Sequence, residues 1–205
     1  MYRPAQFHAL FRRPAAWLGA VGVALAAGAL GLDARIGSLV CNTGWLVLGT
    51  LAISLPVGTL AAVAIARTDV PGRRLSAAGL GAMLLVPVYL QAAAWQSGFG
   101  LQGWVTLNWH SGVWLAGMPA AVWIHGLAAV PWVTLIVAVG LRLVEPELEE
   151  QALLEASPAG VFRHVTLPAC YGAIGVAALW VAVTTSAEMS VTDLFAVRTF
   201  AEEIY

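Results

Sequence analysis

Long runs of apolar residues, separated by short clusters of arginine and acidic residues, dominate this chain. The uncharged runs cover residues 14–32, 36–66, 75–141 and 164–187 and contain 19, 31, 67 and 24 residues. A helix needs about 20 apolar residues to cross the hydrocarbon core of a bilayer, so the longest run has room for two crossings. The pattern predicts an all-α, polytopic transmembrane helix bundle with about five spans, near residues 15–32, 40–66, 75–95, 113–143 and 169–190.

Composition agrees with a chain that has the bilayer as its solvent. Of the 205 residues, 60% are hydrophobic and only 10% are charged, whereas about a quarter of the residues in a soluble domain are charged. The formal net charge is −1, and no basic stripe that would bind a nucleic acid is present. We therefore expect membrane lipid, and no nucleic acid, as a partner of this chain.

The arginines predict the orientation of the bundle. If the spans alternate, eight of the ten arginines fall on one side of the membrane, and only Arg35 and Arg198 fall on the other. Arginine-rich loops stay in the cytoplasm, so the N-terminus is expected inside and the tail after residue 191 outside. We divide the chain into a cytoplasmic segment, 1–14, and a transmembrane domain, 15–205. A cleaved signal peptide is the alternative interpretation of the first run, and it leaves the later orientation unchanged.

Two features of the spans favour a moving bundle over a passive anchor. Small side chains repeat at four-residue spacing in the second span, which puts them on one helix face and lets another backbone approach: Ser54, Gly58, Ala62 and Ala66. Four prolines lie inside the predicted helices, where each is expected to kink or interrupt its helix: Pro56, Pro87, Pro119 and Pro131. Such breaks favour a transporter or channel.

Histidine and cysteine indicate no metal centre. The four histidines are isolated, and we interpret His125, inside a span, as a hydrogen-bonded polar residue of the bundle rather than a haem ligand. Cys41 and Cys170 begin spans at opposite faces, about 30 Å apart, and cannot form a disulfide. The sequence contains no zinc, phosphate-loop or nucleophile pattern. We predict no cofactor, no metal and no catalytic residue.

The cytoplasmic loop at about residues 145–168 carries the most informative pattern, EPELEEQALLEASPAGVFRHVTLP. Pro146 lies in the first turn of a short helix, with glutamates near the positive end of that helix. Ser157 precedes Pro158, so it ends this helix, and it can cap a second helix that runs through Phe162. The loop is therefore predicted to hold two short helices.

Apolar residues of this loop share one face. Leu148, Ala152 and Ala156 recur at four-residue spacing, and Leu153 and Leu154 adjoin them. A solvated connector rarely carries so many apolar groups, so we expect the segment to insert into a partner. Packing of the loop against its own bundle is the alternative interpretation.

The loop resembles the EAA loop of binding-protein-dependent ABC importer permeases. That pattern is Glu-Ala-Ala, three residues, Gly, nine residues, an aliphatic residue, one residue and Leu-Pro. Counting back from Leu167-Pro168 places Val165 at the aliphatic position and Glu155 at the glycine, whereas counting forward from residues 150–152 places Ala156 at the glycine and is one residue short. Neither alignment keeps the glycine or both alanines. The residues that the resemblance assigns to ATPase coupling are Glu149, Glu150, Gln151, Ala152, Leu153, Glu155, Ala156, Leu167 and Pro168.

The resemblance extends along most of the chain from about residue 40. Segments that look like this superfamily are 42–43, 55–58, 67–73 and 129–132. The C-terminal segments 188–194 and 197–205 are similar to permeases of the ferric-iron type. Members of that branch usually carry two homologous halves, each with its own loop, so this chain with one loop corresponds to a first half.

The resemblance implies the permease subunit of an ATP-driven importer in the cell inner membrane, without enzyme activity of its own. A separate cytoplasmic ABC ATPase, an extracytoplasmic solute-binding protein and a second permease half or copy are the implied partners. Ferric iron is the expected cargo, with thiamine or an inorganic oxyanion as alternatives.

Carboxylates near the end of the last span form a possible outer substrate mouth. Glu188, Asp193, Glu202 and Glu203 fall within 16 residues, and hard cations prefer oxygen ligands. A secondary transporter or channel without an ATPase is the alternative function. It would carry ionisable residues at membrane depth, which only Glu188 approaches. A membrane-embedded enzyme would need convergent titratable groups, and the sequence gives none.

Overall fold

The computed structural model describes residues 34–109 and 115–204, and these residues form helices and their connections, with no strand among them. The longer helices are α3 (Ala34–Arg67), α4 (Arg73–Leu84), α5 (Val88–Phe99), α7 (Gly117–Arg142), α8 (Pro146–Leu153) and α11 (Tyr171–Ala187). The shorter ones are α6 (Trp104–Trp109), α9 (Pro158–Val161), the π-helix η2 (Phe162–Thr166), α10 (Leu167–Ala169), α12 (Ser190–Leu194) and α13 (Phe200–Ile204). The all-α prediction is confirmed for this part of the chain. The predicted segment 1–14 and first span, 15–32, lie outside the described residues.

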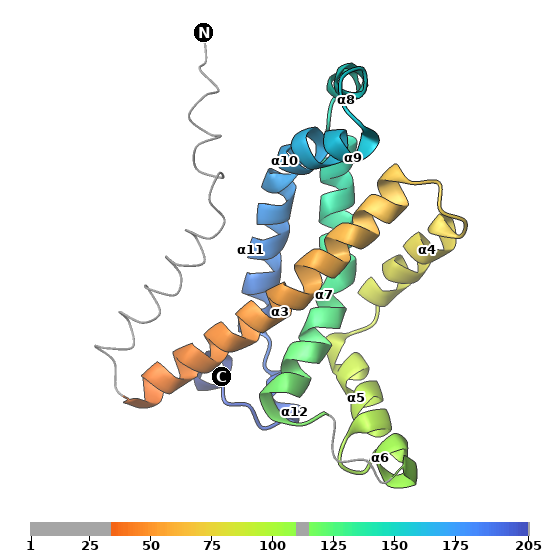
Figure 1. The fold of residues 1–205 in the computed structure, drawn as a ribbon. Helices are drawn as coiled ribbons and strands as arrows, with labels where there is room; N and C mark the ends of the chain where they lie inside the picture. Colours follow the sequence, from red (N-terminus) through yellow and green to blue (C-terminus); the bar gives the residue numbers. More distant parts are fainter. Residues whose placement is uncertain (1–33, 110–114, 205) are drawn as a thin grey trace.

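Two helices are long and apolar enough to cross a membrane alone, α3 from Ile36 and α7. Two further segments qualify only as bent pairs: α4 with the α5–α6 region, bent by 102°, and the α9–α10 region with α11, bent by 55°. The described residues therefore contain two candidate spans, or up to four if each bent pair counts as one. Both α3 and α7 run from the lower to the upper end of Figure 1, side by side.

Glycine and other small residues bring α3 and α7 into close contact. A Cβ atom on Gly58 would lie 2.6 Å from the Cβ of Val133, so only glycine fits there without movement of the neighbour. The neighbouring stripe residues Ser54 and Ala62 are fully buried. The hydroxyl of Thr134 donates to the carbonyl of Val130 in its own helix and also lies 3.2 Å from the carbonyl of Gly58 in α3. The predicted packing role of this stripe is confirmed.

The four prolines differ in their effect on helix continuity. Pro87 does interrupt its segment, because α4 ends at Leu84 and α5 begins after Pro87. Pro56 and Pro131 instead lie inside α3 and α7, which each continue as one helix. Pro119 lies in the first turn of α7, where a backbone N–H has no partner within the helix in any case. The expectation of a kink or interruption is therefore wrong at Pro119, and at Pro56 and Pro131 the helix is not interrupted.

Two apolar clusters form the interior, one towards each end of the bundle. The first joins α3, α7 and α11, with Val133, Val137 and Val181 almost completely buried. The second joins the start of α7 to α12, with Ile124 and Val191 at its centre. At the upper end of Figure 1, α8, α9 and α10 cross the ends of α7 and α11, whereas α12 lies at the lower end.

The segment before α13 is attached to the start of α3. The side-chain amide of Asn42 donates to the carbonyl of Arg198 at 2.9 Å. The hydroxyl of Thr43 accepts the backbone N–H of Phe200, also at 2.9 Å. Thr199, between them, is 1% exposed. The C-terminal tail therefore packs against the first helix that the structure describes.

Candidate functional site

The loop predicted to couple to an ATPase, residues 145–168, folds as a chain of short helices at one end of the bundle. Pro146 is the first residue of α8, and Ser157 caps α9 by accepting the N–H of Gly160 at 3.3 Å. Both helix starts are as predicted. Leu167 and Pro168 then open α10, directly after the π-helical stretch η2.

Glu149 attaches this loop to the bundle. One carboxylate oxygen lies 2.7 Å from a guanidinium nitrogen of Arg67, and the other accepts the hydroxyl of Thr166 at 2.5 Å. Arg67 also donates to the carbonyl of Leu141, at 2.6 Å. The side chains of Arg67 and Glu149 are only 28% and 16% exposed. Charge-assisted hydrogen bonds in such a partly buried setting hold α8 to α3, α7 and η2.

Apolar side chains of the same loop are left uncovered. Leu153 is 49% exposed and Leu154 is 87% exposed. Of the other residues predicted to couple to an ATPase, the exposed ones are Glu150, Gln151, Glu155, Ala156 and Pro168, and the half-buried ones are Ala152 and Leu167. The bundle thus anchors the loop through Glu149 without covering Leu153 and Leu154.

A second candidate site lies where α4 and α5 separate. A cavity of about 240 Å³ opens between this break, α7 and α11. Its polar lining residues are Gln91, His125, Thr184, Thr185 and Glu188. The side-chain amide of Gln91 donates to the carbonyl of Val86 at 3.0 Å. Within a membrane, a backbone break is tolerated where neighbouring groups or a cavity satisfy the freed carbonyls, and this break has both.

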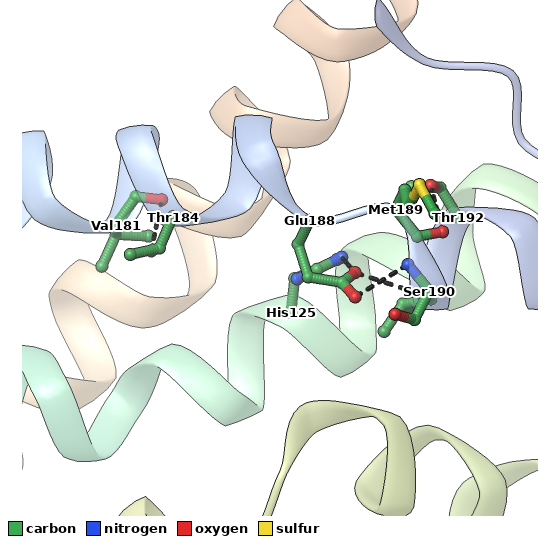
Figure 2. Close-up of polar contacts among 8 residues, drawn as sticks. His125, Val181, Thr184, Glu188, Met189, Ser190 and Thr192 are labelled. Carbon is green, nitrogen blue, oxygen red and sulfur yellow. Dashed lines mark hydrogen bonds and ion pairs between the residues drawn. The ribbon is translucent and has the colours of Figure 1, made fainter. Parts of the chain in front are cut away.

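His125, from α7, and Glu188, from the end of α11, lie next to each other (Figure 2) and both line this cavity. The Nε2 atom of His125 lies 3.4 Å from a carboxylate oxygen of Glu188, and the two side chains are 5% and 20% exposed. This distance is long for a hydrogen bond, and among the described residues Nε2 has no hydrogen-bond partner. His125 is buried in the bundle as predicted, but the expectation that it is hydrogen-bonded is wrong for this nitrogen.

The Glu188 carboxylate also caps the next helix. One oxygen accepts the N–H of Ser190 at 2.8 Å, and the other accepts the N–H of Val191 at 3.1 Å (Figure 2). These are the first N–H groups of α12, which have no partner inside the helix. The carboxylate is thus fixed in position at the turn between α11 and α12.

The two residues predicted at an outer mouth lie in different surroundings. Glu188 contacts His125 at the cavity, whereas Asp193 is exposed on α12. Glu202 is half-buried on α13. Within residues 34–109 and 115–204, no group of three or more His, Cys, Asp or Glu side chains could hold a metal ion. A cation at this end would meet separate carboxylates and the His125–Glu188 pair.

Neither this pair nor the cavity beside it was predicted from the sequence. The available signal was weak: His125 lies inside the 67-residue uncharged run, and Glu188 directly follows the 24-residue run. A titratable residue in an apolar helix usually finds a partner on another helix, so a search for partners could have joined them. The hydrogen bond from Gln91 to the carbonyl of Val86 depends on the break at Pro87. No spacing of residues in the sequence predicts it.

Comparison with known proteins adds no family to this description. A scan against protein-family models finds no match, and a search of curated proteins finds no significant relative.

Proposed function

We propose that this chain is the permease subunit of an ATP-driven ABC importer of the inner membrane, coupled to its ATPase through α8 and the turn that follows it. The observation that carries the proposal is the contrast within α8 between an anchored Glu149 and exposed leucines. This short helix is fixed to the bundle through Glu149, and its end and the next residue, Leu153 and Leu154, are exposed. Such a helix is suited to lie in a groove of another protein.

The anchor explains how motion would pass through the chain. Arg67 ends α3, and Thr166 ends η2, so a force on α8 reaches both elements through Glu149. Closure of an ATPase dimer would then move α8 as part of a rigid body and tip the spans between inward-open and outward-open states. A solute-binding protein would deliver cargo at the opposite end, and a second permease half or copy would complete the pathway.

A pair of matched leucine variants tests the coupling role. Leu154→Asn should abolish co-purification with the partner ATPase, because it places an amide in an apolar contact. Leu75→Asn is the control, since Leu75 is 79% exposed at the start of α4 and is not predicted to touch the ATPase. Both variants should elute as folded protein in detergent. If Leu154→Asn keeps full ATPase binding and ATP-driven uptake, the coupling proposal is wrong.

A bulky substitution at Ala156 tests coupling separately from assembly. Ala156 is exposed in the turn after α8, so Ala156→Trp adds volume at the proposed contact and not in the core. We expect ATP hydrolysis to continue while uptake falls. Retention of full uptake together with ATPase binding would show that the loop is only a connector.

Ferric iron is the cargo that the resemblance predicts, and it is the first solute to test. Uptake of radiolabelled iron by the assembled system should be lost when this chain is deleted. Unchanged iron uptake, together with loss of uptake of another solute, would remove the iron assignment and leave the importer proposal in place.

A secondary transporter is the second candidate, favoured by the His125–Glu188 pair. Ionisable residues at membrane depth are costly and often lie on proton or ion pathways. Proteoliposomes that contain this chain alone, without any ATPase, distinguish the two. Solute uptake driven by an imposed proton gradient would support the secondary transporter, whereas uptake that requires an ATPase and ATP would support the importer.

A further inference from the structure

The cavity between the α4–α5 break, α7 and α11 has a one-sided set of charges. Of its lining residues, Glu188 is the acid and His125 the single possible cation. Among residues 34–109 and 115–204 no arginine lines the cavity, and the chain contains no lysine. An anionic solute would therefore face a carboxylate with at most one titratable partner. A positive charge near Glu188 is attracted more strongly here than in water because the surroundings are apolar.

His125 supplies a second and independent indication of a ligand. Its side chain is only 5% exposed, yet Nε2 makes no hydrogen bond within the described residues. A buried polar atom without a partner costs free energy, and proteins usually satisfy it. In the tautomer with the proton on Nδ1, Nε2 is an acceptor that faces a carboxylate acceptor 3.4 Å away. One ammonium group, with three donors, can donate to both.

The rest of the wall fits an organic body and not a bare ion. Trp132 lines the cavity and packs against Trp180, with ring centroids 5.3 Å apart and planes inclined by 49°, so an aromatic ring belongs to the same wall as His125 and Glu188. Val88 and Val181 add apolar surface. The volume of about 240 Å³ corresponds to roughly eight molecules of liquid water at about 30 Å³ each. The described residues offer no set of three metal-ligating side chains.

We infer that this cavity binds a small organic cation with an N–H donor, a protonated amine, whose ammonium group contacts both His125 and Glu188 from the cavity side and whose apolar part lies against Trp132. Tryptophan is the aromatic side chain that attracts cations most strongly. The inference rests on the proposed transport function for its biological role, because the site would then hold the cargo or a coupling solute within the bundle. It gives a cargo class different from ferric iron.

Equilibrium binding to the purified chain in nanodiscs tests the site with three probes of similar shape and different charge. Radiolabelled benzylamine should bind, neutral benzyl alcohol should compete about tenfold or more weakly, and benzoate should not compete. Glu188→Gln should remove the preference for benzylamine over benzyl alcohol. Glu147→Gln is the matched control, because Glu147 is an exposed carboxylate on α8 at the other end of the bundle, and the affinity of this variant for benzylamine should equal that of the wild type.

A second variant keeps the test independent of the cap on α12. Trp132→Leu leaves Glu188 and its hydrogen bonds untouched and should weaken benzylamine about threefold or more. Absence of benzylamine binding to the wild-type chain, equal competition by benzyl alcohol, or unchanged affinity in Glu188→Gln would each overturn the inference. Displacement of benzylamine by ferric ion at lower concentration than by other amines would also overturn it, in favour of a metal.

The failure of this inference and of the importer proposal can be distinguished. The binding assay contains no ATPase, so it does not depend on coupling through α8. Loss of amine binding with intact ATP-driven iron uptake would remove the amine site and keep the importer. If the amine binds but Leu154→Asn does not change binding of the ATPase, the amine site stands and the importer proposal is wrong.

Discussion

Arg67 and Glu149 form an ion pair of 2.7 Å that joins the last residue of α3 to the loop helix α8, 82 residues further along the chain. The pair is only partly exposed, and Glu149 also accepts a hydrogen bond from Thr166. One carboxylate therefore connects three elements that are distant in sequence. The position of α8 follows from the position of α3, which is what a mechanical connection between a loop and a membrane helix requires.

Loss of the Glu149 carboxylate should release α8. Glu149→Ala leaves the Arg67 guanidinium and the Thr166 hydroxyl without this partner, at a cost of about 1–3 kcal/mol in unfolding free energy. We expect a lower Tm in detergent and faster hydrogen exchange over residues 146–166. Asp69→Ala is the control, because Asp69 pairs with Arg73 on the surface and is 96% exposed. Equal behaviour of the two variants would contradict the anchoring role.

Gly58→Ala should separate α3 from α7. The added Cβ would lie 2.6 Å from Val133 and 3.2 Å from the carbonyl of Val130, so one backbone must move, at a cost of about 1–3 kcal/mol. Gly79→Ala is the matched control in α4, where nothing lies within 4 Å of the new atom, and it should be neutral or slightly stabilising. Thermal unfolding in detergent measures both. A wild-type Tm in Gly58→Ala would refute the close approach of the two helices.

Removal of the Thr43 hydroxyl should expose the C-terminal tail to protease. Thr43→Val keeps the shape of the side chain and loses the acceptor for the Phe200 N–H. We expect trypsin to cleave after Arg198 several times faster than in the wild type, as followed by mass spectrometry. Ser186→Ala removes a hydroxyl bonded within its own helix and should leave the cleavage rate unchanged. Slow cleavage in Thr43→Val would mean that other contacts hold the tail.

The arginine distribution predicts which end of the bundle faces the cytoplasm. A background with Cys41→Ser and Cys170→Ala removes both free thiols, and single cysteines are then introduced at exposed positions. Cysteines at residues 72 and 159 should react with a membrane-impermeant reagent only from inside, and those at residues 102 and 198 only from outside. Reversed labelling would overturn the orientation. Labelling of all four from one side would contradict the bundle itself.

Much of the fold could be predicted because helix-forming signals are local. The uncharged runs predicted α3 and α7 closely, and the four-residue spacing of Ser54, Gly58 and Ala62 predicted the face that α3 buries. Pro146 and Ser157 predicted two short helices of the loop, since a helix start depends on a few adjacent residues.

Features that depend on neighbouring helices were not predictable in the same way. Pro56 and Pro131 stay within continuous helices, while Pro87 interrupts one, and the sequence pattern treats the three alike. The His125–Glu188 pair requires knowledge of which helices adjoin, because the two residues are far apart in sequence. The same limit applies to Glu149, whose partners Arg67 and Thr166 come from two other elements.

The parallel arrangement of α3 and α7 has a consequence for synthesis of the protein. Thr134 follows its partner carbonyl, that of Gly58, by 76 residues, and a ribosome adding about 5–20 residues per second takes roughly 4–15 s to supply it. During this interval α3 presents Thr50, Ser54 and Gly58 without the helix that later buries them. Small residues on one face of a helix let any second helix approach closely, including one from a neighbouring nascent chain. Translation speed and the spacing of ribosomes on the messenger therefore influence whether α3 pairs within its own chain.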